Sequence, residues 1–264
     1  MKKMPLIFIG HGSPMNAIED NIYTKSWKEI GSTLSNPRAI LILSAHWITH
    51  WEIRISTNEI PGMIYDMWGF PSELYQMKYP ARWSSNIARE IRNLLEKNAF
   101  SVQEDPLRWL DHGVWSTLLH LFPDANIPVI SLSLDYSLSP KSLFHLGANL
   151  SILRDQWILI IGSGNIVHNL SAIDWTSKNI FPWAVEFDSR VSSGIRLWKN
   201  SKEFMDILDF SSWGDISKLA HPTYDHLIPL FPLLGAVDRD DRVSFFTPEI
   251  SMGSLSMRSI VWES

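Results

Sequence analysis

Five histidines in this sequence lie where a folded chain can present an imidazole to a ligand. His11 stands between two glycines directly after the apolar residues 6–9, and His46 closely follows the apolar residues 39–43. Three neutral imidazoles can hold a divalent first-row metal ion and leave positions open for a substrate. We therefore predict one histidine-ligated site for a divalent metal ion, drawn from His11, His46, His112, His168 and His226.

Two of these histidines follow segments that we expect to be buried strands. Residues 5–9 and 39–44 carry no charge and almost no polar side chain, which is typical of strands covered on both faces in a parallel or mixed sheet. In open α/β sheets, ligands bind beyond the carboxyl ends of such strands. We predict further strands at residues 51–56, 99–103, 127–134, 157–161, 242–246 and 259–262.

Segments with a helical pattern alternate with these strands. The other three histidines are predicted near the starts of helices or in a turn after a strand. Asp111 is a predicted N-cap, so His112 begins a helix at residues 112–121. His226 is predicted in the first turn of a helix within residues 222–230, and His168 follows a glycine turn after a strand. The pattern predicts an α/β fold with a mostly parallel or mixed central sheet flanked by helices. Other helices are predicted at residues 19–34, 84–97, 183–198 and 203–210, near 71–72 and from 139–140 onward.

Composition narrows the kind of protein and its partners. No linker divides the 264 residues, so we expect one domain over residues 1–264. The chain has no cysteine, which excludes disulfides, thiolate nucleophiles and cysteine-ligated zinc. A net charge of −5 without a basic cluster argues against nucleic acid, and no apolar run is long enough for a signal peptide or a membrane span. We expect a cytoplasmic monomer or small homo-oligomer that acts on a small molecule.

Aromatic residues are abundant, with 13 tryptophans in the chain. Most of them are expected to fill the core, because aromatic side chains bury large apolar areas. A group in one loop could instead line a pocket for a flat ring. This group comprises Tyr65, Trp68 and Phe70.

Seven short motifs give the chain a family resemblance over nearly its whole length. It resembles the class III extradiol ring-cleavage dioxygenases, the superfamily of the catalytic subunit of protocatechuate 4,5-dioxygenase. Within that superfamily it is most similar to the 4,5-DOPA extradiol dioxygenase-like proteins. The motifs are GHGSPMN at residues 10–16, SAHW at 44–47, GFPSEL at 69–74, DHGVW at 111–115, GNIVHNL at 164–170, HLIPL at 226–230 and MGSLSM at 252–257.

The resemblance implies a role for each of the five histidines. His11, His46 and His226 would be metal ligands, and His168 a fourth ligand or an acid-base group. His112 would lie beside the substrate and share catalysis with His168, while the loop containing Tyr65 and Phe70 would border the substrate. The reaction would cleave a catechol ring with O₂ at a single divalent ion.

The identity of that ion stays open. The wider superfamily commonly uses two histidines and a glutamate on Fe(II), whereas this branch has histidine at the third position, here His226. Fe(II) is expected for dioxygenase activity. Zn(II) is expected as the ion found after purification, because it binds such sites more tightly than Fe(II).

Two other functions compete with ring cleavage. A zinc hydrolase could use Ser13 as a helper, although residues 12–14 lack the second glycine of a nucleophile elbow. A non-catalytic, metal-binding interaction protein of the same fold is the second alternative. The presence of His112 and His168, which metal binding alone would not need, favours catalysis. We expect structural roles for the remaining histidines, namely His50, His120, His145 and His221.

Overall fold

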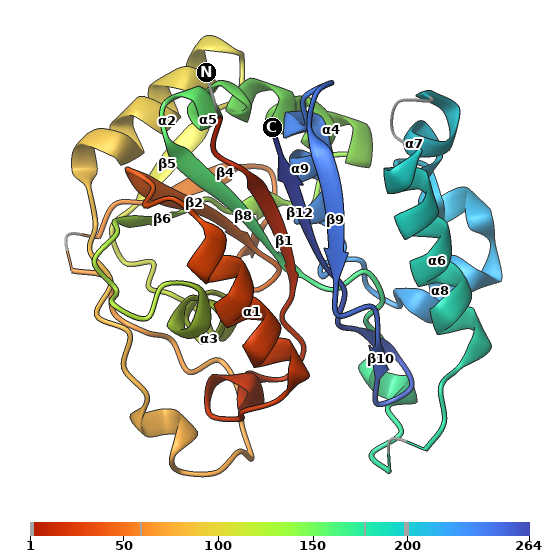
Figure 1. The fold of residues 1–264 in the computed structure, drawn as a ribbon. Coiled ribbons are helices and arrows are strands. Elements are labelled where there is room, and N and C mark those ends of the chain that lie inside the picture. The colour runs from red at the N-terminus through yellow and green to blue at the C-terminus, as the bar shows by residue number, and fades with distance from the viewer. Residues whose placement is uncertain (1–2, 59, 177, 198–200) are drawn as a thin grey trace.

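A mixed six-stranded sheet forms the centre of the computed structural model, which describes residues 3–58, 60–176, 178–197 and 201–264. The strand order is β6-β2-β8-β1-β12-β9, with the first four strands parallel to one another (Figure 1). β12 runs antiparallel to β1, and β9 runs antiparallel to β12. These strands are β1 (Leu6–Gly10), β2 (Ala39–Ser44), β6 (Val129–Ser131), β8 (Ile158–Gly164), β9 (Arg242–Phe246) and β12 (Ser259–Glu263).

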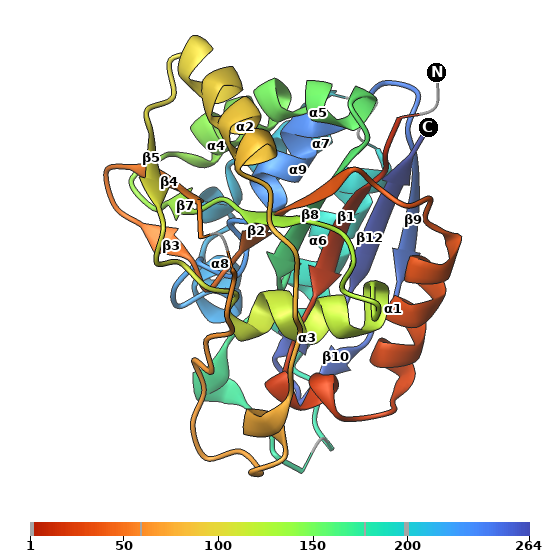
Figure 2. The ribbon, with the colours of Figure 1, turned by 90° about the vertical axis from the view of Figure 1, so that its left-hand side faces the viewer.

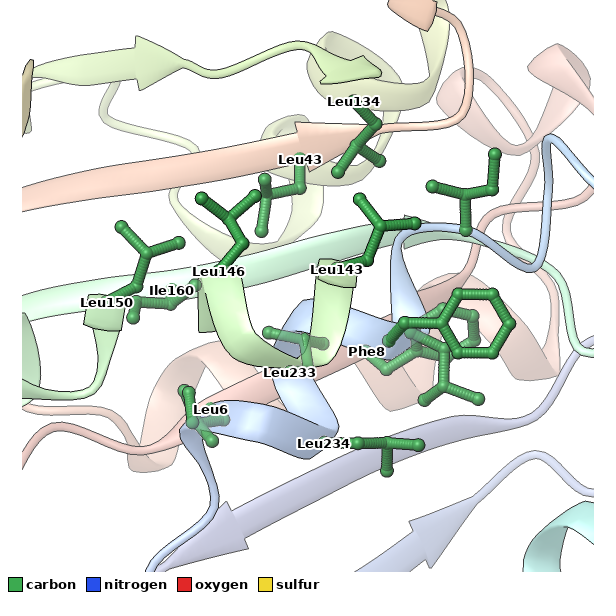
Figure 3. Packing of buried hydrophobic residues seen from close by; sticks show 14 of the residues in the cluster. Leu6, Phe8, Leu43, Leu134, Leu143, Leu146, Leu150, Ile160, Leu233 and Leu234 are labelled. Carbon is green, nitrogen blue, oxygen red and sulfur yellow. The ribbon is translucent and has the colours of Figure 1, made fainter. Parts of the chain in front are cut away.

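The central strands are apolar because both of their faces are covered. Successive side chains of a strand point to opposite faces, and in β1 Leu6 and Phe8 belong to one core cluster while Ile7 and Ile9 belong to the other. The same alternation occurs in β2 and β8. Figure 3 shows leucines of α4 and α9 packed against Phe8 of β1 and Ile160 of β8.

Helices cover the two faces unequally. α1 (Ile22–Thr33) and α3 (His112–Leu121) pack against each other over the face that carries Ile7 and Ile9 (Figure 2). α4 (Pro140–Leu150) and α9 (Leu230–Ala236) cover the opposite face, with α2 (Ser85–Lys97) beside α4. Three more helices stand beside β9 at the right of Figure 1, namely α6 (Pro182–Arg196), α7 (Ser201–Ile207) and α8 (Asp215–Ala220).

Short elements connect this framework. Three two-stranded sheets are formed by β3 (Ile48–Thr49) with β7 (Leu134–Asp135), β4 (Ile53–Ser56) with β5 (Val102–Asp105), and β10 (Ile250–Ser251) with β11 (Leu255–Ser256). The helix α5 (Ile152–Asp155) precedes β8. Single 3₁₀ turns occur at η1 (Pro14–Ala17), η2 (Leu74–Gln76), η3 (Leu170–Ala172) and η4 (Phe210–Trp213). Among the described residues, none of the helices has the length and apolar character that crossing a membrane requires.

The predicted α/β fold with a mixed central sheet is confirmed, and several elements differ locally from the prediction. Residues 127–134 form two strands rather than one, because the chain leaves β2 after Leu132 and the backbone N–H of Ser133 donates to Arg54 of β4. His226 lies in a turn before α9 and not in a helix, since Pro229 removes a donor and the helix begins only at Leu230. The helix predicted at residues 183–198 is described only to Arg196, and residue 198 lies outside the described part of the chain.

Candidate metal centre

A pocket of about 390 Å³ opens beyond the carboxyl ends of β1, β2 and β8. All five histidines singled out in the sequence line it, although they come from segments more than 200 residues apart. Phe70 and Trp68 line it as well. The residues that the sequence proposed for metal and substrate are therefore brought together, with the exception of Tyr65.

Tyr65 does not line this pocket. Its hydroxyl donates to the backbone carbonyl of Met77 at 2.8 Å, and its ring packs beside Tyr75 and Trp115. The substrate-binding role predicted for Tyr65 is not supported by this position. The same loop does reach the pocket through Asp66, Met67, Trp68 and Phe70.

Close backbone approaches hold the histidine-bearing turns together. His11 follows β1, and its backbone N–H donates to the carbonyl of Gly164 at 3.0 Å. The backbone N–H of Asn165 donates to the carbonyl of His226 at 2.9 Å, so the end of β8 binds both turns. A Cβ atom at Gly164 would lie 2.2 Å from that carbonyl oxygen, which makes glycine the residue that fits there.

Hydrogen bonds on the outer side of each ring fix which nitrogen faces the pocket. The Ser163 hydroxyl donates its proton to the Gly113 carbonyl at 2.6 Å, so it must accept from Nδ1 of His11 at 3.0 Å. Nδ1 of His226 donates to the Asp225 carboxylate at 2.6 Å. Both rings then carry their proton on Nδ1 and present Nε2 as a lone-pair donor, which is how metal-binding imidazoles are commonly oriented.

Asp66 orients two further rings in the same way. Its carboxylate accepts from Nδ1 and from the backbone N–H of His112 at 3.0 and 2.9 Å. Nδ1 of His46 lies 3.4 Å from its other oxygen. Neither Asp66 nor Asp225 was identified from the sequence, although the adjacency of Asp225 to His226 offered a signal, because ligating histidines usually need such an acceptor.

The spacing of the imidazoles fits a shared cation. Nε2 of His11 lies 3.1 Å from Nε2 of His46. Because each ring carries its proton on Nδ1, the two Nε2 lone pairs face each other with no proton between them. The ring centroids of His11, His46 and His226 are separated by 5.0, 5.3 and 5.0 Å. Two imidazoles bound to one ion at about 2.1 Å and a tetrahedral angle have centroids about 5 Å apart.

A different set of three meets a distance criterion on the ligand atoms themselves. It shares His11 and His46, takes His112 as its third member, and has its ligand nitrogens within 4.8 Å of one another. The ring centroids of His46 and His112 are only 4.0 Å apart, which is closer than the separation of about 5 Å expected around one ion. The spacing of the ring centroids therefore fits His226 as the third ligand, whereas the distances between ligand atoms single out His112.

His168 differs from the other four histidines. Its ring lies parallel to that of His226, with centroids 3.4 Å apart and an interplanar angle of 4°. Its backbone N–H donates to the carbonyl of Ala220 and its backbone pairs with Leu255. Within the described residues, no hydrogen bond involves its side chain. Its ring lines the pocket and is held in place by stacking on His226.

Burial keeps four of the five imidazoles neutral at ordinary pH. Burial lowers the pKa of His46 and of His168 to about 4, and it lowers the pKa of His11 and His226 well below the ordinary value. Burial by itself would raise the pKa of Asp66, but the hydrogen bond from His112 and the nearby imidazoles lower it to about 2. The pocket therefore combines neutral nitrogen donors with one ionised carboxylate.

The remaining histidines lie away from the pocket. His120 bonds the Asn16 carbonyl and contacts the Trp27 ring, and His221 bonds the Ile166 carbonyl at 2.7 Å. His50 lies near Tyr136 and His145 near Phe144. None of these four lines the pocket, in agreement with the structural roles expected for them.

The buried His221 should make stability depend on pH. Burial lowers its pKa from 6.5 to about 4, so the unfolded chain takes up the proton first as the pH falls. The contribution of the buried neutral ring to the free energy of unfolding is complete above pH 6.5. It is lost as the pH falls from 6.5 to 4, and the loss is about 3 kcal/mol in total. Urea unfolding of the metal-free protein across this pH range should show a steeper loss of stability than the His221→Gln variant. Equal slopes in the two proteins would contradict this assignment.

An α/β fold with a mixed sheet thus places a cluster of oriented imidazoles where a single metal ion could be held. Comparison with known proteins then gives the family: residues 5–259 match the catalytic LigB subunit of aromatic ring-opening dioxygenase, and the chain belongs to this family. It is 39% identical to the 4,5-DOPA dioxygenase extradiol of Escherichia coli K12, over 98% of this chain and 94% of that protein. It is 35% identical to the protein of the same name from Beta vulgaris, over 96% and 94% of the two chains.

A solved structure supports the same relationship. The crystal structure of an uncharacterized protein from Escherichia coli K12 superposes with a TM-score of 0.85 at 36% identity, covering 98% of this chain and 99% of that chain. The predicted family and fold are confirmed, and the chain is by class an oxidoreductase, an aromatic ring-opening dioxygenase. None of the relatives named here is described as a hydrolase or as a non-catalytic binding protein.

Proposed function

We propose that the protein is an extradiol dioxygenase that opens the ring of a catechol with O₂ at one divalent metal ion. His11, His46 and His226 hold this ion, and residues 1–264 form one catalytic domain. The observation that carries the proposal is the near-equal spacing of the three imidazoles, whose Nε2 lone pairs are directed into the pocket. Family membership and the names of the relatives support the reaction class.

The natural ion in this proposal is Fe(II). When bound, it would lower the pKa of the catechol hydroxyls and supply the redox chemistry that links ring and O₂. Zinc has no accessible redox step, so a zinc-loaded protein would bind catechols without opening them. The neutral three-nitrogen donor set suits either ion, and zinc competes well for such sites.

Two histidines of the pocket handle protons in this proposal. His168 has free nitrogens and is neutral at ordinary pH, so it accepts a proton from a catechol hydroxyl and returns it to the opening ring. His112 keeps its proton on Nδ1, where it donates to Asp66, and its Nε2 lone pair accepts the proton of the second catechol hydroxyl. Phe70 and the neighbouring apolar side chains hold the flat ring and exclude water.

The test is reconstitution of the metal-free protein with Fe(II) under anaerobic conditions. O₂ and a catechol panel of DOPA, caffeic acid and protocatechuate are then added in separate reactions. We expect oxygen uptake and a yellow ring-opened product with at least one member of the panel. The zinc-loaded protein serves as the control and should give neither signal. Iron-loaded protein that consumes no oxygen with any catechol would refute the proposal.

A further inference from the structure

We propose, on the basis of the proposed function, that His221 is a positioning residue for His168. His221 does not line the pocket, so it does not contact a substrate bound there. It acts through the backbone of the turn at residues 166–169, which carries His168. Loss of its hydrogen bond to this turn should slow proton transfer and leave the metal site intact.

The His168 ring depends on its backbone for its position. Within the described residues, no hydrogen bond involves its side chain, whereas Nδ1 of His11, of His112 and of His226 each has an acceptor. Stacking on His226 holds the plane of the ring, but the place of the ring within that plane follows the backbone. Because a misplacement of about 1 Å can cost about 100-fold in rate, whatever fixes this backbone should matter for turnover.

The end of α8 holds one side of the turn. The last carbonyl groups of a helix have no partner within the helix, and two of those of α8 accept hydrogen bonds from the turn. The Ala220 carbonyl accepts from the backbone N–H of His168 at 3.0 Å, and the Leu219 carbonyl accepts from the side-chain amide of Asn169 at 2.7 Å. His221 is the next residue, the C-cap of α8.

His221 supplies a third hydrogen bond to the same turn. Its Nε2 lies 2.7 Å from the Ile166 carbonyl, which can only accept, so Nε2 carries the proton. Its other nitrogen, Nδ1, is buried without a hydrogen-bond partner in the described parts of the chain, and the ring packs beside Phe187 and Phe210. An apolar residue would serve better if packing were the only role, since an unpaired buried polar atom costs stability. The bond to Ile166 is therefore what the imidazole supplies at this position.

β11 holds the opposite side of the turn. The backbone N–H of Ser256 donates to the Val167 carbonyl at 3.0 Å, and that of Asn169 donates to the Ser254 carbonyl at 3.3 Å. Hydrogen bonds of the backbone to α8 and to β11 therefore alternate along the turn. Removing the bond from His221 leaves the β11 side intact, so the turn should shift rather than unfold and should carry the His168 ring with it.

The first test compares His221→Leu with His221→Gln in the iron-loaded protein. Leucine removes the donor, whereas the amide nitrogen of glutamine has the reach of Nε2 and can restore the bond. For a catechol that the unaltered enzyme opens, His221→Leu should lower kcat by about 10–100-fold, with KM and iron content nearly unchanged. His221→Gln should recover most of this loss. An unchanged kcat in His221→Leu, or an equal fall in both variants, would overturn the proposal.

Amide hydrogen exchange in the metal-free protein tests the same bond without turnover. His221→Leu should speed exchange of the His168 N–H and leave the amides of β1 and β2 unchanged. Ser217→Ala is the matched control, because the Ser217 hydroxyl donates from the same helix to the Phe210 carbonyl, away from the turn. This control should change neither exchange at the turn nor kcat. Unaltered exchange of the His168 N–H in His221→Leu would count against the proposal.

Two further outcomes are kept apart by this design. If His221→Leu does not fold, His221→Asn takes its place, since its side chain is too short to reach the Ile166 carbonyl, and the same results are expected. If the unaltered iron-loaded enzyme opens no catechol, the proposed function is refuted. The exchange measurement then still shows whether His221 fixes the turn, because it needs neither metal nor substrate.

Discussion

Replacing His226 with alanine is expected to lower the affinity for iron by at least about a hundredfold. Loss of a partner in the outer shell of a metal site already costs 10–100-fold in affinity, and loss of a ligand should cost more. The imidazole of His226 is oriented by Asp225 at 2.6 Å and lies 5.0 to 5.3 Å, centroid to centroid, from the other two rings. Alanine leaves no donor atom in that direction, and turnover should be lost with the ion.

The matched control for this variant is His112→Ala. The His112 ring lies 4.0 Å from that of His46, and we place it beside the substrate rather than on the ion. This variant should retain iron while its activity falls. Iron per protein after gel filtration and the affinity from chelator competition distinguish the two variants. If His112→Ala loses the ion and His226→Ala keeps it, the ligands are His11, His46 and His112 instead.

The strands that carry His11 and His46 could be predicted because their burial leaves a direct mark on the sequence. Both faces of β1 and β2 are covered, so the strands are apolar over consecutive residues and end where the first polar residues appear. The N-cap Asp111 was equally visible, since its side chain accepts from the backbone N–H of Val114 at the start of α3. Parallel strands then bring their ends together at one edge of the sheet.

Contacts between distant segments could not be predicted in the same way. Asp66 forms a hydrogen bond with His112, which is 46 residues away in the sequence. Ser163 forms one with His11, which is 152 residues away. A lone aspartate or serine in a loop has no pattern that reveals its partner, because the pairing depends on how the loops pack. The same reason explains Trp175, which reaches the pocket from a loop that gave no signal of its own.

Replacing His168 with alanine is expected to leave iron bound but to reduce turnover by about 10²–10⁴-fold, the range that a positioned acid-base group contributes. The ring of His168 stacks on that of His226 with centroids 3.4 Å apart, and it makes no side-chain hydrogen bond among the described residues. It is therefore held by packing alone, with its nitrogens available to a catechol. A ligand of the ion would instead need an acceptor to orient it, as Asp225 does for His226.

Three measurements on His168→Ala separate proton transfer from metal binding. Iron content should match that of the unaltered protein, anaerobic catechol affinity should change little, and oxygen uptake should fall. His168→Gln restores a polar side chain of similar reach without an ionisable group, so it should stay as inactive as alanine. Recovery of activity in His168→Gln would indicate that the residue only positions the catechol. Loss of iron in both variants would make His168 a fourth ligand, and the proton would then have to be accepted at Nε2 of His112.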